Sequence, residues 1–128
     1  MRGHALACAA GLCAALASVT GKFATGDMEN MPLIPNHWIL NLIFRLLFIT
    51  CTLALNSVMW TFFVESMQHL NSAEASVLNV GCNILLSGVL GWFCFGESVP
   101  AIWWCGASLI VTGIAVMHTA ESDKEKMS

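Results

Sequence analysis

Residues 46–64 read LLFITCTLALNSVMWTFFV and contain no Asp, Glu, Lys or Arg. Arg45 and Glu65 stand directly at the two ends of this uncharged stretch. In an α-helix each residue adds 1.5 Å, so about 20 apolar residues cross a hydrocarbon core of roughly 30 Å. The stretch therefore predicts a membrane-spanning helix.

Three more stretches of similar length are free of charged side chains. They lie between Arg2 and Lys22, between Glu74 and Glu97, and between Glu97 and Glu121. Hydrophobic residues make up 57% of the 128 residues and charged residues only 10%, which leaves no room for a soluble domain. A water-soluble four-helix bundle is the weaker alternative, because helices that are apolar on nearly all sides must be buried or face lipid. We predict an all-α fold, a polytopic membrane protein with four transmembrane helices in a single membrane domain.

The four helices are expected at about 4–24, 38–66, 74–95 and 99–118, followed by a short polar C-terminal tail over 119–128. The first span also has features of a cleavable signal peptide, because Arg2 precedes an apolar run with the small-residue pattern Ala15-Leu16-Ala17. However, one face of this helix carries Gly11, Ala15, Ser18 and Lys22. Such a stripe of small residues is typical of a helix that packs, so we expect the first span to be retained.

A polar segment with helix-breaking residues is expected to connect the first two spans. It contains Asp27, Glu29, Pro32 and Pro35. Arg45, about two turns into the second helix, is interpreted as an interfacial anchor whose long side chain reaches the headgroups. The alternative is that it marks a transport pathway, as charges within membranes often do.

Polar residues deep in the second and third spans are candidates for a substrate path. Thr52 and Asn56 lie four residues apart on one face of the second helix. On the third, Ser76, Asn79, Asn83 and Ser87 form one stripe. Uncharged polar groups in hydrocarbon need partners, so this stripe is expected to face other helices or water. Two roles stay open: the polar residues line a path, or they hydrogen-bond neighbouring helices.

The third and fourth spans are joined by the short turn Phe95-Gly96-Glu97-Ser98-Val99-Pro100. Gly96 is expected to end one helix, while Ser98 caps the next and Pro100 lies in its first turn. This arrangement predicts an antiparallel hairpin. Two pairs of small residues, Ser87 with Gly91 and Gly106 with Gly113, predict close packing between its helices.

The remaining reactive residue types show no pattern of a catalytic or metal site. The six cysteines are scattered singly through the apolar spans, without the close pairing of zinc or redox sites. We interpret them as small buried hydrophobes, and His4, His37, His69 and His118 as interfacial polar residues. No nucleophile and base pairing or phosphate-binding glycine loop stands out. We therefore predict no enzyme activity, no cofactor, no metal and no nucleic-acid partner.

From Trp60 to Met117 the order of features resembles the second half of an EamA-type domain of the drug/metabolite transporter superfamily. The features are Ser72-Ala73-Glu74-Ala75-Ser76 opening a helix, Gly91, the pair Gly96-Glu97, Pro100, Gly106 and Gly113. The first span is similar to the family's opening helix through Gly11, Ala14, Ala15 and Lys22. The resemblance implies half of an EamA-like transporter fold, in a small four-span branch.

The resemblance also implies a function and a mode of assembly. Ordinary EamA domains have five helices and full transporters carry two such domains in opposite orientation, so this shorter chain would have to act as a homodimer or other oligomer. The implied function is transport of a small molecule or metabolite, with Thr52, Asn56, Asn79, Asn83 and Ser87 as substrate-path candidates. The alternative is a non-transporting multi-pass subunit that assembles with another membrane protein. In either case the lipid bilayer surrounds the chain.

Charged residues indicate little about coupling or orientation. Four-span multidrug transporters of the same superfamily resemble proton couplers with a glutamate in the first helix, but no carboxylate lies between Arg2 and Lys22 here. Glu97 is interpreted as a capping or anchoring residue. Lysine and arginine slightly favour both termini in the cytoplasm. The small bias also permits insertion in both orientations, which an inverted-repeat transporter built from one chain would need.

Overall fold

The computed structural model describes residues 1–26 and 38–127, apart from the side chains of residues 121, 124 and 125. It has four α-helices: α1 (Arg2–Thr25), α2 (Trp38–Met67), α3 (Ser72–Phe95) and α4 (Ala101–Met127). No strand occurs in the described ranges. All four helices are long and apolar enough to cross a membrane, which confirms the predicted all-α, polytopic class. The expected connection through Asp27, Glu29, Pro32 and Pro35, with His37, lies outside the described residues.

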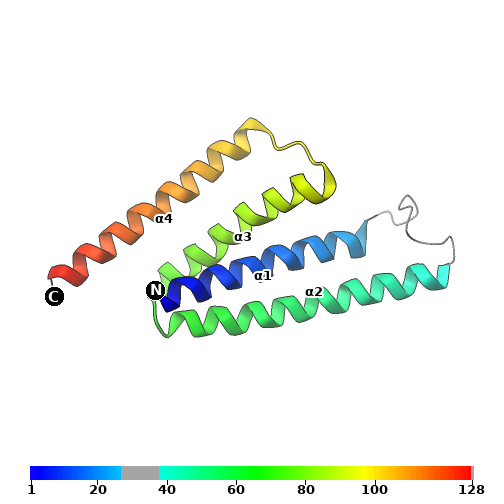
Figure 1. The fold of residues 1–128 in the computed structure, drawn as a ribbon, viewed down its shortest axis with the longest axis horizontal. Coiled ribbons are helices and arrows are strands. Elements are labelled where there is room, and N and C mark those ends of the chain that lie inside the picture. Colours follow the sequence, from blue (N-terminus) through cyan, green and yellow to red (C-terminus); the bar gives the residue numbers. More distant parts are fainter. Residues whose placement is uncertain (27–37, 128) are drawn as a thin grey trace.

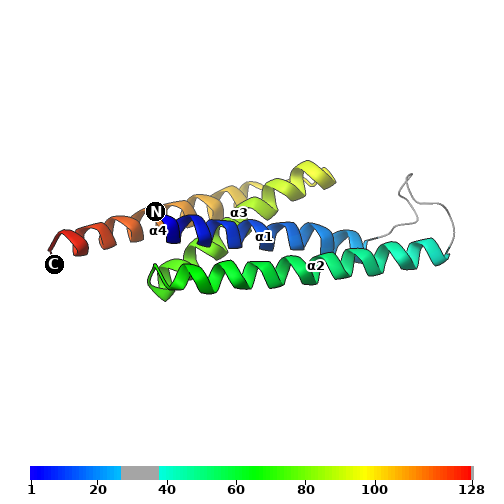
Figure 2. The same ribbon diagram turned by 60° about the horizontal axis from the view of Figure 1, so that its bottom comes forward.

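Successive helices run in opposite directions, and α1 lies alongside both α2 and α3 (Figures 1 and 2). One end of the bundle therefore collects the starts of α1 and α3, the end of α2 and the C-terminal part of α4. We call it the terminal end, and the opposite end, with the end of α1 and the turn from α3 to α4, the loop end.

Small residues bring α1 close to its neighbours. Its buried residues are Gly3, Ala7, Ala10, Gly11, Ala15, Ala17 and Ala24. The closest approach is at Gly11, where an added Cβ would lie 2.6 Å from Cys82 Cβ and 2.7 Å from the backbone oxygen of Asn79. Only glycine fits against the α3 backbone at this distance. Of the predicted stripe, Gly11 and Ala15 are buried, whereas Ser18 is exposed.

The turn after α3 follows part of the expected chemistry. Gly96 adopts the left-handed conformation (φ 62°, ψ 25°) that ends many helices, as predicted. The next helix begins later than expected, at Ala101, and the amide of Trp103 donates to the oxygen of Pro100 at 2.9 Å. Ser98 therefore lies before the helix rather than at its cap.

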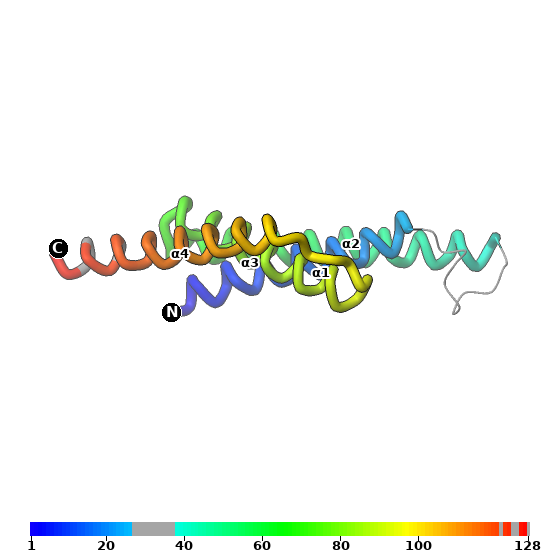
Figure 3. Tube along the Cα trace, turned by 90° about the horizontal axis from the view of Figure 1, so that it is seen from above, coloured from blue at the N-terminus to red at the C-terminus, as the bar shows by residue number. Residues whose placement is uncertain are grey.

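Beyond the turn, α4 diverges from the other three helices (Figure 1), and its C-terminal end extends past the N-terminus of the chain (Figure 3). The expected close packing through Gly106 and Gly113 does not occur within the chain, because a Cβ added at either would meet no atom within 4 Å. On α3, the nearest atom to a Cβ added at Gly91 belongs to Glu97 in the following turn, 2.9 Å away.

Different glycines make the contact between α3 and α4. Gly88 lies directly against the Trp103 ring, and a Cβ added at Gly81 would lie 2.8 Å from Ile114 and 3.1 Å from Ile110. Bulky side chains of α4 thus fit into glycine notches of α3, and their size keeps the two helix axes apart.

The helical C-terminal segment is longer than expected. The membrane-spanning part of α4 runs to Ala120, but the helix continues to Met127 through the segment expected as a polar tail. That segment is rich in Glu and Lys, which favour helices. The last turns of α4 therefore form a polar extension of the apolar span.

Candidate functional site

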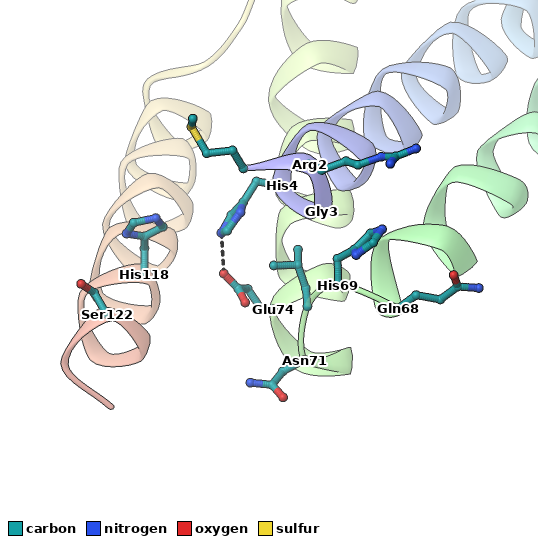
Figure 4. A pocket seen from close by; sticks show the side chains of 11 residues that line it. Arg2, Gly3, His4, Gln68, His69, Asn71, Glu74, His118 and Ser122 are labelled. Carbon is teal, nitrogen blue, oxygen red and sulfur yellow. Dashed lines mark hydrogen bonds and ion pairs between the residues drawn. The ribbon is translucent and has the colours of Figure 1, made fainter. Parts of the chain in front are cut away.

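A buried carboxylate lies at the terminal end. Glu74, in the first turn of α3, is only 5% exposed. His4 Nε2 of α1 lies 2.7 Å from Glu74 Oε1, so the pair joins the starts of the two helices (Figure 4). Burying a charged group is costly unless it is paired. The imidazole and the helix N-terminus, which favours negative charge, both offset that cost.

A polar pocket of about 630 Å³ surrounds this pair. Its lining comprises Met1, Arg2, Gly3, His4, Gln68, His69, Leu70, Asn71, Glu74, His118 and Ser122. The His118 ring of α4 lies 5.4 Å from the His4 ring, centroid to centroid (Figure 4). At the rim, Arg2 is 3.8 Å from Glu65 of α2, and both side chains are partly exposed. All four helices or their flanking turns therefore contribute polar side chains to one space.

Sequence reasoning treated the histidines of this pocket as separate interfacial residues and Glu74 as part of a helix start. The available signal was topological. In a chain of four alternating spans, residue 4, the residues between the second and third spans, and the end of the fourth span fall on the same side. This topology places His4, His69 and His118 near one boundary, but residue spacing does not indicate that His4 contacts Glu74.

At the loop end, Lys22 forms an ion pair with Glu97. Both side chains are about half exposed. The Lys22 ammonium also lies 4.5 Å from the centroid of the Phe95 ring, and the centroid of the tilted Phe23 ring lies 4.9 Å from that of Phe95. Glu97 thus connects the α3–α4 turn to the end of α1. Arg45 Nη2 approaches the oxygen of Gly26 at 3.5 Å.

Several predicted path residues are engaged in hydrogen bonds within the membrane span. The hydroxyls of Thr52 (α2) and Thr20 (α1) lie 2.8 Å apart. Asn56 Nδ2 donates to the backbone oxygen of Thr52 at 2.8 Å, and Ser87 donates to that of Ile84 at 3.2 Å. Thr52 therefore connects two helices, while Asn56 and Ser87 bond within their own helices. The structure does not join these three into one cavity.

Asn79 and Asn83 differ from these residues. Their Oδ1 atoms are buried and have no hydrogen-bond partner among the described residues. Both lie where α3 passes Gly11 of α1, in the middle of the span. Asn41 Oδ1, near the loop end of α2, shares this property. A buried acceptor without a donor costs free energy, so each of these oxygens is suited to a further donor.

The cysteines form neither disulfides nor a metal centre in the described structure. All six are free thiols. Cys8 and Cys82 lie in contact, with their sulfur atoms 3.3 Å apart, between α1 and α3. Among the described residues, no group of three His, Cys, Asp or Glu side chains is arranged to hold a metal ion.

Four apolar helices with polar pairs at both ends define an integral, multi-pass membrane protein. Comparison with known families makes this more specific: the EamA-like transporter family matches residues 28–119, and the chain belongs to that family. The match includes α2, α3 and the spanning part of α4, but not α1. No solved structure is significantly similar to the chain.

Proposed function

We propose that this chain is a carrier of small molecules that acts as a homodimer, with a substrate path along the Asn79 and Asn83 face of α3. The observation that carries the proposal is the pair of buried, unpartnered carbonyl oxygens in the middle of the span. Such acceptors are unfavourable in hydrocarbon unless a donor forms a hydrogen bond with them. A substrate with amide, hydroxyl or amine donors would satisfy them in transit.

Assembly of two copies is supported by the surfaces that one copy leaves open. On α4, Ile102, Leu109 and Val116 are 80%, 74% and 64% exposed, and the two unpacked glycines lie on the same helix. Glycines spaced two turns apart allow close approach of another helix. Alternating access requires two bundles that move against each other. Two copies of the chain would supply them, with eight helices in total. We further propose that both termini face the cytoplasm.

The path is tested by volume-conserving variants in proteoliposomes. Uptake of a panel of tritiated amino acids, monocarboxylates, polyamines and nucleosides is measured first for the unaltered protein. Asn79→Leu and Asn83→Leu should each reduce uptake of the transported compound about tenfold, because leaving a donor of the substrate buried without its partner costs about 1 to 3 kcal/mol. The dimer, measured by native mass spectrometry in nanodiscs, should persist.

Asn41→Leu is the matched control, because it removes another buried, unpartnered amide oxygen far from the middle of the span. Its uptake should stay within twofold of the unaltered protein. Equal loss of uptake in all three variants, or loss of the dimer in the two α3 variants, would show that the asparagines hold helices together rather than line a path.

The second candidate is a non-transporting subunit that covers α4 with another membrane protein. The exposed apolar face of α4 favours it as well. A monomer in nanodiscs that co-purifies with one other protein in fixed ratio, and transports no compound of the panel, would establish this function instead.

A further inference from the structure

We propose that the pocket at the terminal end is a proton-dependent binding site for a small anion. This inference deepens the proposed function and rests on it for the passage of the anion across the membrane, but binding itself is measurable without transport. The pocket volume of about 630 Å³ is sufficient for a small organic anion. Most of its lining residues are polar, unlike those of the groove between α3 and α4.

The charge of the lining depends on three histidines. Arg2 and Glu74 balance one another, so the lining side chains carry no net charge while His4, His69 and His118 are neutral. Protonation of all three changes this to three positive charges. Histidine is the side chain whose charge ordinarily changes near neutral pH, so a pocket lined by three of them is suited to proton-dependent binding of an anion.

Among the side chains that the structure describes, the other charged groups near the pocket do not reverse this gain of positive charge. Glu65 pairs with Arg2 at the rim and would lower the total by one charge. Met1 also lines the pocket. On α4, Asp123 and Lys126 are exposed and do not line it. The lining histidines come from α1, the turn after α2, and α4, whereas α3 contributes Glu74.

Two helix N-termini add to the preference for an anion. α1 begins at Arg2 and α3 at Ser72, both at the terminal end. The first amides of a helix are unpaired, and its dipole favours negative charge there. Glu74 already lies in this field. When His4 is protonated, it forms an ion pair with Glu74. The positive charges of protonated His69 and His118 are then available to bind an anion.

Binding of the anion and binding of protons are therefore thermodynamically linked. Each favours the other by the same factor, because coupling between two ligands is reciprocal. For a carrier, this means that the anion and protons occupy the terminal end together. The class of ligand is then an anionic group, either on a free solute or on a lipid headgroup at the membrane surface.

The test uses probes whose own charge does not change with pH. Binding of benzenesulfonate and of benzyltrimethylammonium, similar in size and opposite in charge, is measured by equilibrium dialysis against the full-length protein in phosphatidylcholine nanodiscs. We expect the affinity for benzenesulfonate to rise at least about tenfold from pH 8.0 to pH 5.5, since three positive charges appear within one pocket. The cation should show no such increase.

The decisive variant replaces His69 and His118 and keeps His4, because the His4 side chain pairs with Glu74 and joins two helices. The double variant His69→Gln, His118→Gln should reduce the rise with acid to about threefold or less, because it leaves only one of the three lining histidines. Arg45→Gln, which removes a positive charge at the loop end, is the control and should retain the full rise. Glu74→Gln should instead strengthen benzenesulfonate binding at pH 8.0, since it removes the negative charge of the lining.

The source of the anion is distinguished by lipid composition. Binding of benzenesulfonate is compared at constant pH between nanodiscs with and without phosphatidylglycerol, after subtraction of the signal from empty nanodiscs of the same lipid. If the site binds a lipid headgroup, phosphatidylglycerol should compete and weaken binding. If it binds a free solute, binding should be equal in both lipids. Affinity that does not change with pH, or that changes equally in the double variant, overturns the inference. If the anion site is overturned but compounds of the panel are still taken up, the proposed carrier function stands. If benzenesulfonate binds as expected but no compound is transported, the carrier function is wrong and the anion site stands.

Discussion

The first and last helices of this chain differ sharply in how they use small residues. On α1, glycine and alanine are buried and bring the helix against α2 and α3. On α4, Gly106 and Gly113 contact nothing within 4 Å of an added Cβ. The sequence pattern is similar in both helices. A pattern of small residues therefore indicates that a helix can pack closely against another. Which helix it packs against depends on the large side chains that face it.

Among the variants that test this difference between α1 and α4, substitution of Gly11 should change the stability of the protein most. Gly11→Leu would place a side chain where an added Cβ already lies 2.7 Å from the Asn79 oxygen. Because backbone cannot move aside as a side chain does, we expect destabilisation by about 3 kcal/mol. The measurement is unfolding of the protein in mixed micelles, followed by tryptophan fluorescence and circular dichroism.

Gly113→Leu is the control on α4. Its stability in the monomer should stay within about 0.5 kcal/mol, because the position is open within the chain. In nanodiscs the same variant should weaken the proposed dimer. Equal destabilisation of the two monomers would show that α4 is packed as tightly as α1.

The two ion pairs at opposite ends should differ next. Glu74→Ala removes the buried partner of His4, and we expect a loss of about 2 kcal/mol at pH 6, less than for fully buried pairs because His4 is 34% exposed. The loss is measured by the same unfolding assay. A loss no larger than that of Glu97→Ala would contradict the role of Glu74 in joining α1 to α3.

A smaller effect is expected for the hydroxyl pair between α1 and α2. Each hydroxyl carries one hydrogen, so Thr20 donates either to Thr52 or to the Ala17 oxygen while Thr52 donates to the Phe48 oxygen. Thr52→Val keeps the shape and should cost about 1 kcal/mol, as typical for hydrogen bonds between transmembrane helices. Thr50→Val, which removes a hydroxyl bonded only within α2, is the control and should be nearly neutral. No difference between the two variants would exclude Thr52 as a link between helices.

The smallest effect belongs to the pair at the loop end. Glu97→Gln should cost about 0.5 kcal/mol or less, because both partners of this ion pair are about half exposed and solvent screens them. The cost should vanish at about 1 M salt, where the Debye length is near 3 Å. Unfolding at low and high salt measures it, and a large cost that persists at high salt would indicate a functional rather than a local role for Lys22 and Glu97.

The fold was predictable from the sequence because length and hydropathy determine whether a helix crosses a bilayer. The four uncharged stretches predicted four spans, and Gly96 predicted where α3 ends. The family followed from the Gly-Glu turn and the glycines around it. The course of α4 was not predictable, because Gly81 and Gly88 receive the side chains of Ile114 and Trp103 in the places assigned to other glycines.

The candidate site divides in the same way. The sequence by itself determined the class of protein, the number of spans and the polar face with Asn79 and Asn83, since these depend on local composition and helical periodicity. Only the tertiary structure decided that His4, Glu74 and His118, of which successive members are 70 and 44 positions apart in the sequence, share one pocket. Helix order places them at the same end, but contact depends on helix rotation and tilt, which packing between small and large side chains sets.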